Sequence, residues 1–230
     1  GGAASPPTSG RFPTMTATSP SSIPPNRRRH FSMIREFHLA DVFTLANGFL
    51  GAGAVLAFMQ FLIDRQKSYF WLGVALLPAA LVMDVLDGRI ARRRRVASRL
   101  GQELDSLADA VSFGVAPAAL AFAAGLRGGW DAPFLIFFVG CGISRLARYN
   151  VTAEDMSAGT GKVRYFEGTP IPTSVLLVLL LAVMTAYGRT GANVWWGAWP
   201  IAGEQFHPLV LLFVVSGSLM ISKTLRIPKP

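Results

Sequence analysis

Cysteine, histidine and charged residues are all scarce in this 230-residue chain. Cys141 is the only cysteine, so the chain cannot form an intramolecular disulfide or a multi-cysteine metal site. Charged residues make up 15% and hydrophobic residues 51% of the sequence, and the mean hydropathy is +0.41. These values exclude an ordinary soluble domain of this size and predict an all-α integral membrane protein.

Large hydrophobic residues are nearly absent from residues 1–30, which are rich in Pro, Ser, Thr and Gly. Such a segment buries too little apolar surface to offset the entropy lost on ordering. It also lacks the apolar run after a charged start that marks a signal peptide. We therefore expect a disordered tail over 1–30 and a membrane domain over 31–230.

Six apolar segments follow the tail, each close to the roughly 20 residues needed to cross a hydrocarbon core of about 30 Å. Charged residues, glycines and prolines separate them, which predicts that helices end there. Pro117 lies within the third segment and predicts a kink or a locally open backbone. The six predicted transmembrane helices are 41–62, 69–90, 104–126, 131–150, 171–188 and 206–223.

The segment HFSMIREFHLADVF, 30–43, has apolar residues at helical spacing with Arg35, Glu36 and His38 between them. This pattern predicts an N-terminal amphipathic helix lying along the membrane interface before the first span. The alternative is that the segment simply extends the first transmembrane helix.

The basic residues indicate which side of the membrane each connection faces. If the N-terminus is cytosolic, 18 of the 22 Lys and Arg residues fall on the cytosolic side, leaving Arg65, Lys67, Arg127 and Arg189 outside. This asymmetry predicts that both termini are cytosolic. The net charge of +9 comes from short blocks between apolar spans and not from one continuous face, which favours the bilayer surface over nucleic acid as a partner.

The stretch DVLDGRIARRRRVASRLGQELDSLAD, 84–109, places four aspartates and six arginines between the second and third spans. On helices, Asp84 and Asp87 share one face at spacing i, i+3, and Asp105 and Asp109 share another at i, i+4. If these two spans pack side by side as a hairpin, the two pairs meet at one depth near the cytosolic boundary.

Four facing carboxylates cannot all remain ionised unless cations lie between them. Oxygen ligands suit Mg²⁺ or Mn²⁺, and the lack of His or Cys nearby argues against zinc. The alternative is a solvated loop, or ion pairs between these aspartates and the neighbouring arginines. The small residues Gly88, Ala91 and Gly101 would let a ligand approach the backbone closely. Arg92 could reach a phosphate group, whereas Arg93, Arg94, Arg95 and Arg99 are typical of a basic anchor at lipid headgroups.

Read as D-x2-D-G-x2-A-R-x8-G-x3-D-x3-D from Asp84 to Asp109, the stretch resembles the signature of the CDP-alcohol phosphotransferase family at every fixed position. The segments HFSMIREFHLADVFTLANGF, CGISRLARYNVT and GKVRYFEGTPIPTS are similar to the fungal-like phosphatidylserine synthase branch of that family. The resemblance covers roughly residues 30–230. Thr169 and Ile171 depart from the pattern expected in FEGTPIP.

The resemblance implies transfer of the phosphatidyl group of CDP-diacylglycerol to the hydroxyl of L-serine, with release of CMP. It implies that Asp84, Asp87, Asp105 and Asp109 bind one or two divalent ions, Mg²⁺ or Mn²⁺, and that Asp109 is also the general base. Gly88, Ala91, Arg92 and Gly101 would line the site for the CDP moiety. A homodimer is typical of the family, and the membrane would be the endoplasmic reticulum in a eukaryote or the cytoplasmic membrane in a bacterium.

Serine must be held by residues outside the shared signature, because sister enzymes with other alcohols carry the same signature. Arg145 and Arg148 are i, i+3 neighbours at the cytosolic end of the fourth span, and a guanidinium suits the carboxylate of an amino acid. The alternative is that both are basic anchors. Glu167 could meet the serine ammonium. The predicted acceptor residues are Arg145, Arg148, Tyr149, Asn150 and Glu167.

Two other functions are compatible with parts of this pattern. A sister phosphotransferase would use glycerol phosphate, inositol phosphate or another alcohol, and the RLARYN and FEGTPIP segments argue against it. A cation transporter or channel would distribute acids through the depth of its spans and would favour internal repeats. Here the acids cluster at one boundary, which argues against transport.

Overall fold

The computed structural model describes residues 1–2, 39–94, 99–157, 165–222 and 226–228. The predicted tail, apart from residues 1–2, lies outside the described residues, as does most of the predicted amphipathic helix. Residues 39–43 of that segment belong to the first described helix, which continues directly into the first span.

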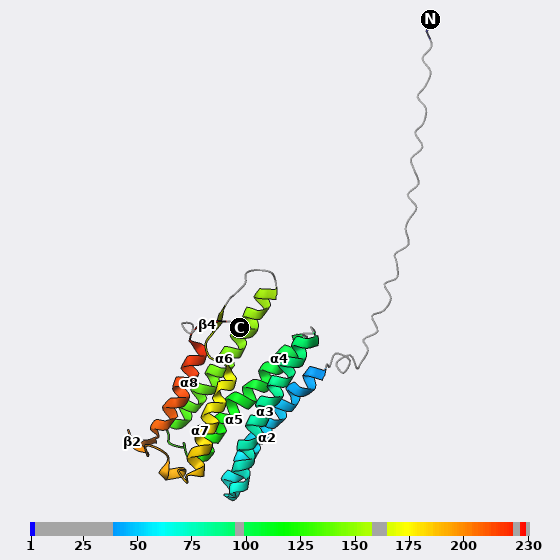
Figure 1. Ribbon diagram of the computed structural model, residues 1–230. Helices are drawn as coiled ribbons and strands as arrows, with labels where there is room; N and C mark the ends of the chain where they lie inside the picture. Colours follow the sequence, from blue (N-terminus) through cyan, green and yellow to red (C-terminus); the bar gives the residue numbers. More distant parts are fainter. Residues whose placement is uncertain (3–38, 95–98, 158–164, 223–225, 229–230) are drawn as a thin grey trace. The chain divides into compact units, whose positions relative to one another are not determined.

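Helices dominate the described residues, and each predicted span corresponds to a helical segment (Figure 1). The second half of the chain also contains three short 3₁₀ segments, η2 (Ile171–Ser174), η3 (Gly191–Asn193) and η4 (Pro208–Val210). The helices are α2 (Leu39–Asp64), α3 (Lys67–Arg94), α4 (Arg99–Asp109), the π-helix η1 (Ala110–Val115), α5 (Ala116–Ala124), α6 (Asp131–Ser157), α7 (Val175–Ala186) and α8 (Leu211–Ile221).

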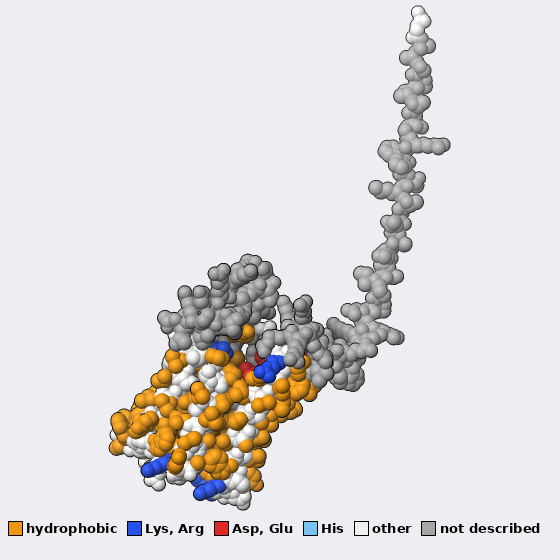
Figure 2. Space-filling model, in the orientation of Figure 1, with side chains coloured by type: hydrophobic (Ala, Val, Ile, Leu, Met, Phe, Trp, Pro, Cys, Tyr) orange, Lys and Arg blue, Asp and Glu red, His pale blue; other side chains and the backbone are white. Residues whose placement is uncertain are grey.

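Four helical segments are long and apolar enough to cross a membrane: Asp41–Asp64, Lys67–Ile90, Leu100–Ala124 and Asp131–Thr152. The last two predicted spans correspond to shorter apolar helices, Ile171–Ala186 and Pro208–Ile221. Figure 2 shows hydrophobic side chains over most of one face, with basic side chains near its two ends. Exposed apolar surface on this scale is typical of a protein whose solvent is lipid.

The third span contains the open backbone that Pro117 predicts. Residues 110–115 form a π-helix, in which the Ala116 N–H donates to the Val111 carbonyl five residues earlier. Pro117 has no N–H to donate, and its ring would clash with a carbonyl one turn before it in a regular helix. The wider turn immediately before the proline relieves both problems.

The third span is also the centre of the helical body. About 61% of an 18-residue apolar stretch within Leu100–Ala124 is buried, against 28–33% of the matching stretches in the other three long spans. Phe113 and Leu120 are fully buried there. Helix α2 packs along α3 and also against α4, η1 and α5, whereas α6 packs chiefly against α8.

The observed packing of the second and third spans differs in one respect from the predicted hairpin. Helix α3 meets the third span mainly at η1 and α5, and α4 packs instead against α2. The close approach of α2 to the third span depends on a small residue of α2, because a Cβ on Gly51 would overlap Ser112 of η1. The acidic ends of α3 and α4 therefore approach each other mainly through side chains.

Two short antiparallel strand pairs depart from the purely helical prediction. Strands β2 (Trp199–Ile201) and β3 (Glu204–Phe206) form a hairpin around Ala202 and Gly203, both of which have positive φ. Strand β1 (Tyr165–Glu167) pairs with β4 (Arg226–Pro228). Three-residue strands have no periodicity that a sequence pattern can reveal.

Candidate functional site

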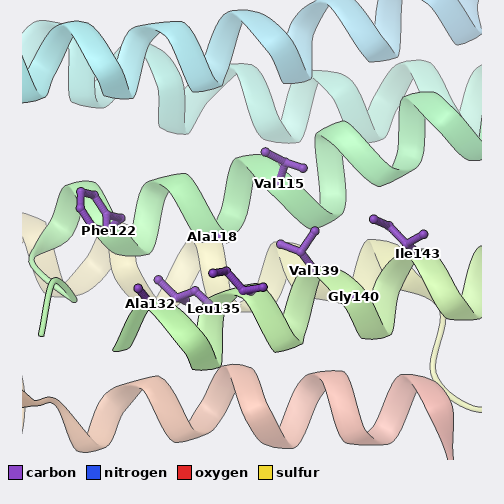
Figure 3. A pocket seen from close by; sticks show the side chains of 9 residues that line it. Val115, Ala118, Phe122, Ala132, Leu135, Val139, Gly140 and Ile143 are labelled. Atoms are coloured by element: carbon purple, nitrogen blue, oxygen red, sulfur yellow. The ribbon is translucent and has the colours of Figure 1, made fainter. Parts of the chain in front are cut away.

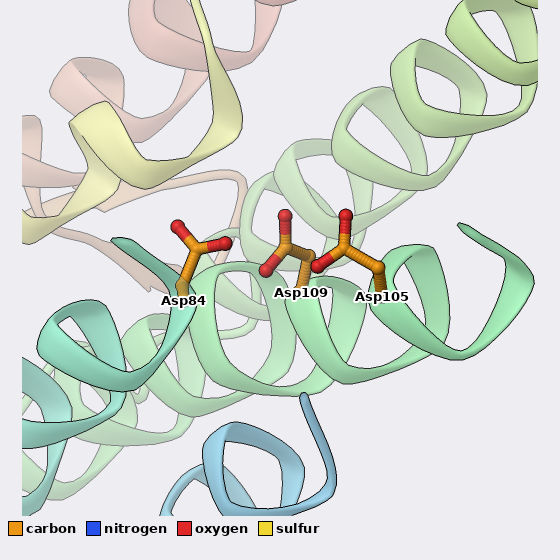
Figure 4. Close-up of side chains that lie close together, drawn as sticks. All are labelled: Asp84, Asp105 and Asp109. Atoms are coloured by element: carbon orange, nitrogen blue, oxygen red, sulfur yellow. The ribbon is translucent and has the colours of Figure 1, made fainter. Parts of the chain in front are cut away.

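Three aspartates from two helices converge at one end of the helical body. Asp84 lies in the second half of α3, and Asp105 and Asp109 lie one turn apart on α4. One carboxylate oxygen from each lies within 4.8 Å of the others. Figure 4 shows the three carboxylates side by side, pointing to the same side of α4. Their convergence confirms the predicted juxtaposition of the acids for three of the four.

The fourth aspartate, Asp87, is buried beside this cluster. Its Oδ2 accepts a hydrogen bond of 2.8 Å from the Thr44 hydroxyl of α2. Asp87 also lies close enough to interact electrostatically with Asp84, Asp105 and Asp109. The four signature acids therefore share one electrostatic environment.

The same helix α2 supports Asp109. Asn47 is fully buried, and its amide Nδ2 donates to Asp109 Oδ1 at 3.1 Å. The Ser112 hydroxyl of η1 in turn donates to the backbone carbonyl of Asn47 at 2.9 Å. These contacts hold the end of α4 against α2 at the level of the acids.

The donor set fits a hard divalent cation. Two unit negative charges within 4.8 Å repel by about 3 kcal/mol or more at an effective dielectric constant near 20. Asp105 Oδ1 is buried and has no hydrogen-bond partner among the described residues, which suits an oxygen that binds an ion. The group contains carboxylates alone, which Mg²⁺ and Mn²⁺ prefer and zinc sites usually supplement with His or Cys.

The predicted acceptor residues on α6 have different surroundings. Arg145 is half-buried and interacts electrostatically with Asp109 and Tyr149. Arg148 is exposed, and its Nη1 donates to the Ile221 carbonyl at the end of α8 at 3.3 Å. Tyr149 is exposed on α6. Arg145 therefore interacts with one of the signature acids.

Asn150 contacts α4 directly. Its Oδ1 lies 3.2 Å and its Nδ2 3.0 Å from the Ser106 hydroxyl, while Gln102 and Glu103 lie at 3.5 Å from the amide. Ser106 follows Asp105 in the sequence. The amide of Asn150 thus links the predicted acceptor helix to the helix that carries two of the acids.

For the remaining predicted residues, the structure describes only the position of the backbone. Gly88 lies on α3 one residue after Asp87, and Gly101 lies on the first turn of α4. The side chains of Ala91, Arg92 and Glu167 lie outside the described residues, as do those of Arg93, Arg94, Arg95 and Arg99.

Four contributors to the site were missed by the sequence analysis: Thr44, Asn47, Ser106 and Ser112. Asp41, Thr44 and Asn47 recur every three residues in an otherwise apolar span and are all buried. Buried polar side chains at that spacing predict a polar face on a membrane helix. This was the signal available in the sequence.

An apolar groove runs between α5 and α6 (Figure 3). Its volume is about 460 Å³, and it is lined by side chains such as Phe122, Leu135 and Val139, with Val115 nearest in sequence to Asp109. No ionisable side chain lines it. The groove offers apolar contacts alone and no group for catalysis.

A second buried polar cluster lies between the start of α6 and the segment before α8. Asp131 accepts bonds from the Gly128 N–H at 2.7 Å and the His207 N–H at 2.9 Å, and His207 Nδ1 lies 2.5 Å from Asp131 Oδ2. It lies at the opposite ends of helices α6 and α8 from Arg148 and Ile221. This cluster therefore joins two helices away from the acids.

Comparison with known proteins places the chain among lipid-synthesising enzymes. The profile of the CDP-alcohol phosphatidyltransferase family matches residues 37–206. A Saccharomyces cerevisiae relative named CDP-diacylglycerol–serine O-phosphatidyltransferase is 45% identical over 207 residues, which cover 87% of this chain and 74% of the relative. Bacterial relatives of the same name come from Mycobacterium leprae (37% identical, 64% of this chain and 47% of the relative) and Bacillus subtilis (29% identical, 68% and 84%).

Proposed function

This chain belongs to the CDP-alcohol phosphatidyltransferase family, and from that premise we propose that it is a phosphatidylserine synthase. It transfers the phosphatidyl group of CDP-diacylglycerol to the hydroxyl of L-serine and releases CMP. The observation that carries this proposal is the convergence of Asp84, Asp105 and Asp109 from two helices within 4.8 Å. The relatives named for the serine reaction support the choice of acceptor.

In this proposal, Asp84, Asp87, Asp105 and Asp109 hold one or two divalent ions, Mg²⁺ or Mn²⁺. Such an ion, when bound, neutralises charge on the pyrophosphate oxygens. The serine oxygen forms a bond to the β-phosphorus, the bond from that phosphorus to the oxygen of CMP breaks, and Asp109 takes the proton of the serine hydroxyl. Gly88, Ala91, Arg92 and Gly101 line the site for the CDP moiety.

The acceptor is held by α6 and by the segment that precedes α7. Arg145 and Arg148 offer guanidinium groups for the serine carboxylate, and Tyr149 and Asn150 complete the end of the site. Glu167 meets the serine ammonium. The electrostatic interaction of Arg145 with Asp109 supports a position for the carboxylate of serine next to the proposed base.

The chain crosses the membrane six times, with both termini and the acids on the cytosolic side. The basic residues concentrated on that side support this orientation. The two helices shorter than the others, Ile171–Ala186 and Pro208–Ile221, complete the six spans. We further propose a homodimer, located in the endoplasmic reticulum if the source is eukaryotic and in the cytoplasmic membrane if it is bacterial.

The test is CMP release by the purified full chain in mixed micelles containing CDP-diacylglycerol. Serine, glycerol 3-phosphate, inositol and inositol phosphate are compared, each with and without Mg²⁺ or Mn²⁺. We expect release with serine that depends on the divalent ion. Faster release with another alcohol would make that alcohol the acceptor in place of serine. No CMP release, together with ion flux through the chain reconstituted in sealed vesicles, would exclude the enzyme.

A further inference from the structure

We propose that Asn47 is a positioning residue for Asp109, setting the orientation in which that carboxylate meets the acceptor hydroxyl. The proposal rests on the function proposed above and assigns to helix α2 a part in the reaction that the signature motif does not contain. Asn47 acts through Asp109 and does not touch substrate, because its side chain is fully buried.

The contact between the two side chains is specific in its direction. Asn47 Nδ2 donates to Asp109 Oδ1 at 3.1 Å, and a carboxylate can only accept. The terminal torsion of an aspartate is broad and is not fixed by its rotamer alone. A donor that holds one of the two oxygens removes this freedom and leaves the other oxygen in a defined direction.

The backbone of Asn47 is held as firmly as its side chain. Its carbonyl accepts the Ser112 hydroxyl at 2.9 Å. Gly51, one turn later on α2, lets the two segments approach so closely that a Cβ there would overlap Ser112. Gly48 faces Ala108, the residue before Asp109, and a Cβ there would lie 3.4 Å from the Ala108 Cβ. The amide is thus presented from a rigid contact between α2 and the third span.

The surroundings of the Asn47 amide oxygen indicate that this asparagine does not serve to stabilise the fold. Asn47 Oδ1 is buried and has no hydrogen-bond partner among the described residues. A buried acceptor without a partner costs stability. An apolar side chain with the same branched shape would leave no unpaired acceptor at position 47, so the asparagine is best explained by what its N–H group does to Asp109.

The experiment compares Asn47→Leu and Asn47→Asp with the wild-type full chain in the CMP-release assay, measuring kcat and both KM values. Both variants remove the amide donor, one without and one with a carboxyl group in its place. We expect kcat to fall about 10- to 100-fold, as for other groups that orient a catalytic residue. The KM values for serine and CDP-diacylglycerol should stay within about twofold, and the thermal midpoint of each variant is measured to show that it is folded.

Gln60→Leu is the matched control because it also removes an amide that donates to an aspartate, Asp64, but at the end of α2 away from the acids. Its kcat should stay within about twofold of wild type. Retained kcat in the folded Asn47 variants would overturn the proposal, as would an equal loss in Gln60→Leu or a loss confined to KM. A wild-type chain without serine-dependent CMP release would overturn the proposed function itself, which separates the two failures.

Discussion

Ser106 of α4 and Asn150 of α6 are hydrogen-bond partners, with contacts of 3.0 and 3.2 Å between residues 44 positions apart in the sequence. Ser106 lies between Asp105 and Asp109 along α4, and Asn150 follows the proposed serine-binding arginines on α6. This pair therefore connects the helix of the acids to the helix of the acceptor site.

Removing either partner should weaken serine binding through the position of α6. Ser106→Ala and Asn150→Ala should each raise the serine KM, and the double variant should be no worse than the more severe single one. A coupling free energy of about 0.5–3 kcal/mol in this double-mutant cycle is expected for residues in contact. Additive effects would mean that Asn150 acts on serine by itself.

Asp109→Asn should abolish turnover while CDP-diacylglycerol still binds. An amide of the same shape cannot accept the proton of the serine hydroxyl, so kcat should fall at least about 100-fold. CMP release and equilibrium binding of the CDP-lipid in the presence of the divalent ion measure the two properties. Near-normal phosphatidylserine formation by this variant would remove Asp109 as the base.

Asp84→Asn should change the metal requirement. This substitution removes one of three converging carboxylates, so the Mg²⁺ or Mn²⁺ concentration for half-maximal activity should rise about tenfold or more. Titration of each ion into the chelator-treated enzyme gives the measurement. Glu103→Gln is the control, since this exposed carboxylate lies on the same helix as two of the acids but outside the cluster. An unchanged ion requirement in Asp84→Asn would exclude Asp84 as a ligand.

Arg148→Ala should raise the KM for serine much more than the KM for CDP-diacylglycerol. The substitution also removes the bond to the Ile221 carbonyl, so the thermal midpoint must be measured alongside. Arg189→Ala is the matched control, because Arg189 is an exposed arginine beyond the far end of α7. Equal increases in both KM values would point to a general disturbance of the site and against a serine-binding role.

His207→Ala should destabilise the fold without changing the catalytic rate. The variant removes the ring contact to the buried Asp131, and a hydrogen bond to a charged group contributes about 1.5–3 kcal/mol. The thermal midpoint in detergent should therefore fall, while kcat per folded molecule stays within about twofold. A selective loss of kcat with an unchanged midpoint would contradict a purely structural role.

Most helix positions could be predicted because membrane spans are defined by long apolar runs and by the helix-breaking residues between them. The structure ends α2 at Asp64 and begins α6 at Asp131, within two residues of the predicted boundaries. Helix α6 instead continues to Ser157, since no glycine or proline follows Asn150 until residue 159. Apolar runs alone could not predict this extension into polar sequence.

The candidate site was predicted less completely than the helices. The spacing of Asp84, Asp105 and Asp109 was informative because i, i+4 positions share a helix face. The contributions of Thr44 and Asn47 depend on α2 packing against both α3 and α4, a tertiary arrangement that local periodicity does not encode. The pairing of Ser106 with Asn150 was unpredictable for the same reason.

The π-helical turn at 110–115 has a consequence for how the chain tolerates insertions and deletions. Each residue advances an α-helix by about 100°, so one residue more or less in this turn would swing α5 by that angle relative to α4. The wide turn lets Asp105 and Asp109 of α4 face Asp84 while Leu120 and its neighbours on α5 stay buried. A one-residue deletion in this turn would therefore misalign either the acids of α4 or the buried face of α5, even if every side chain of both helices were kept.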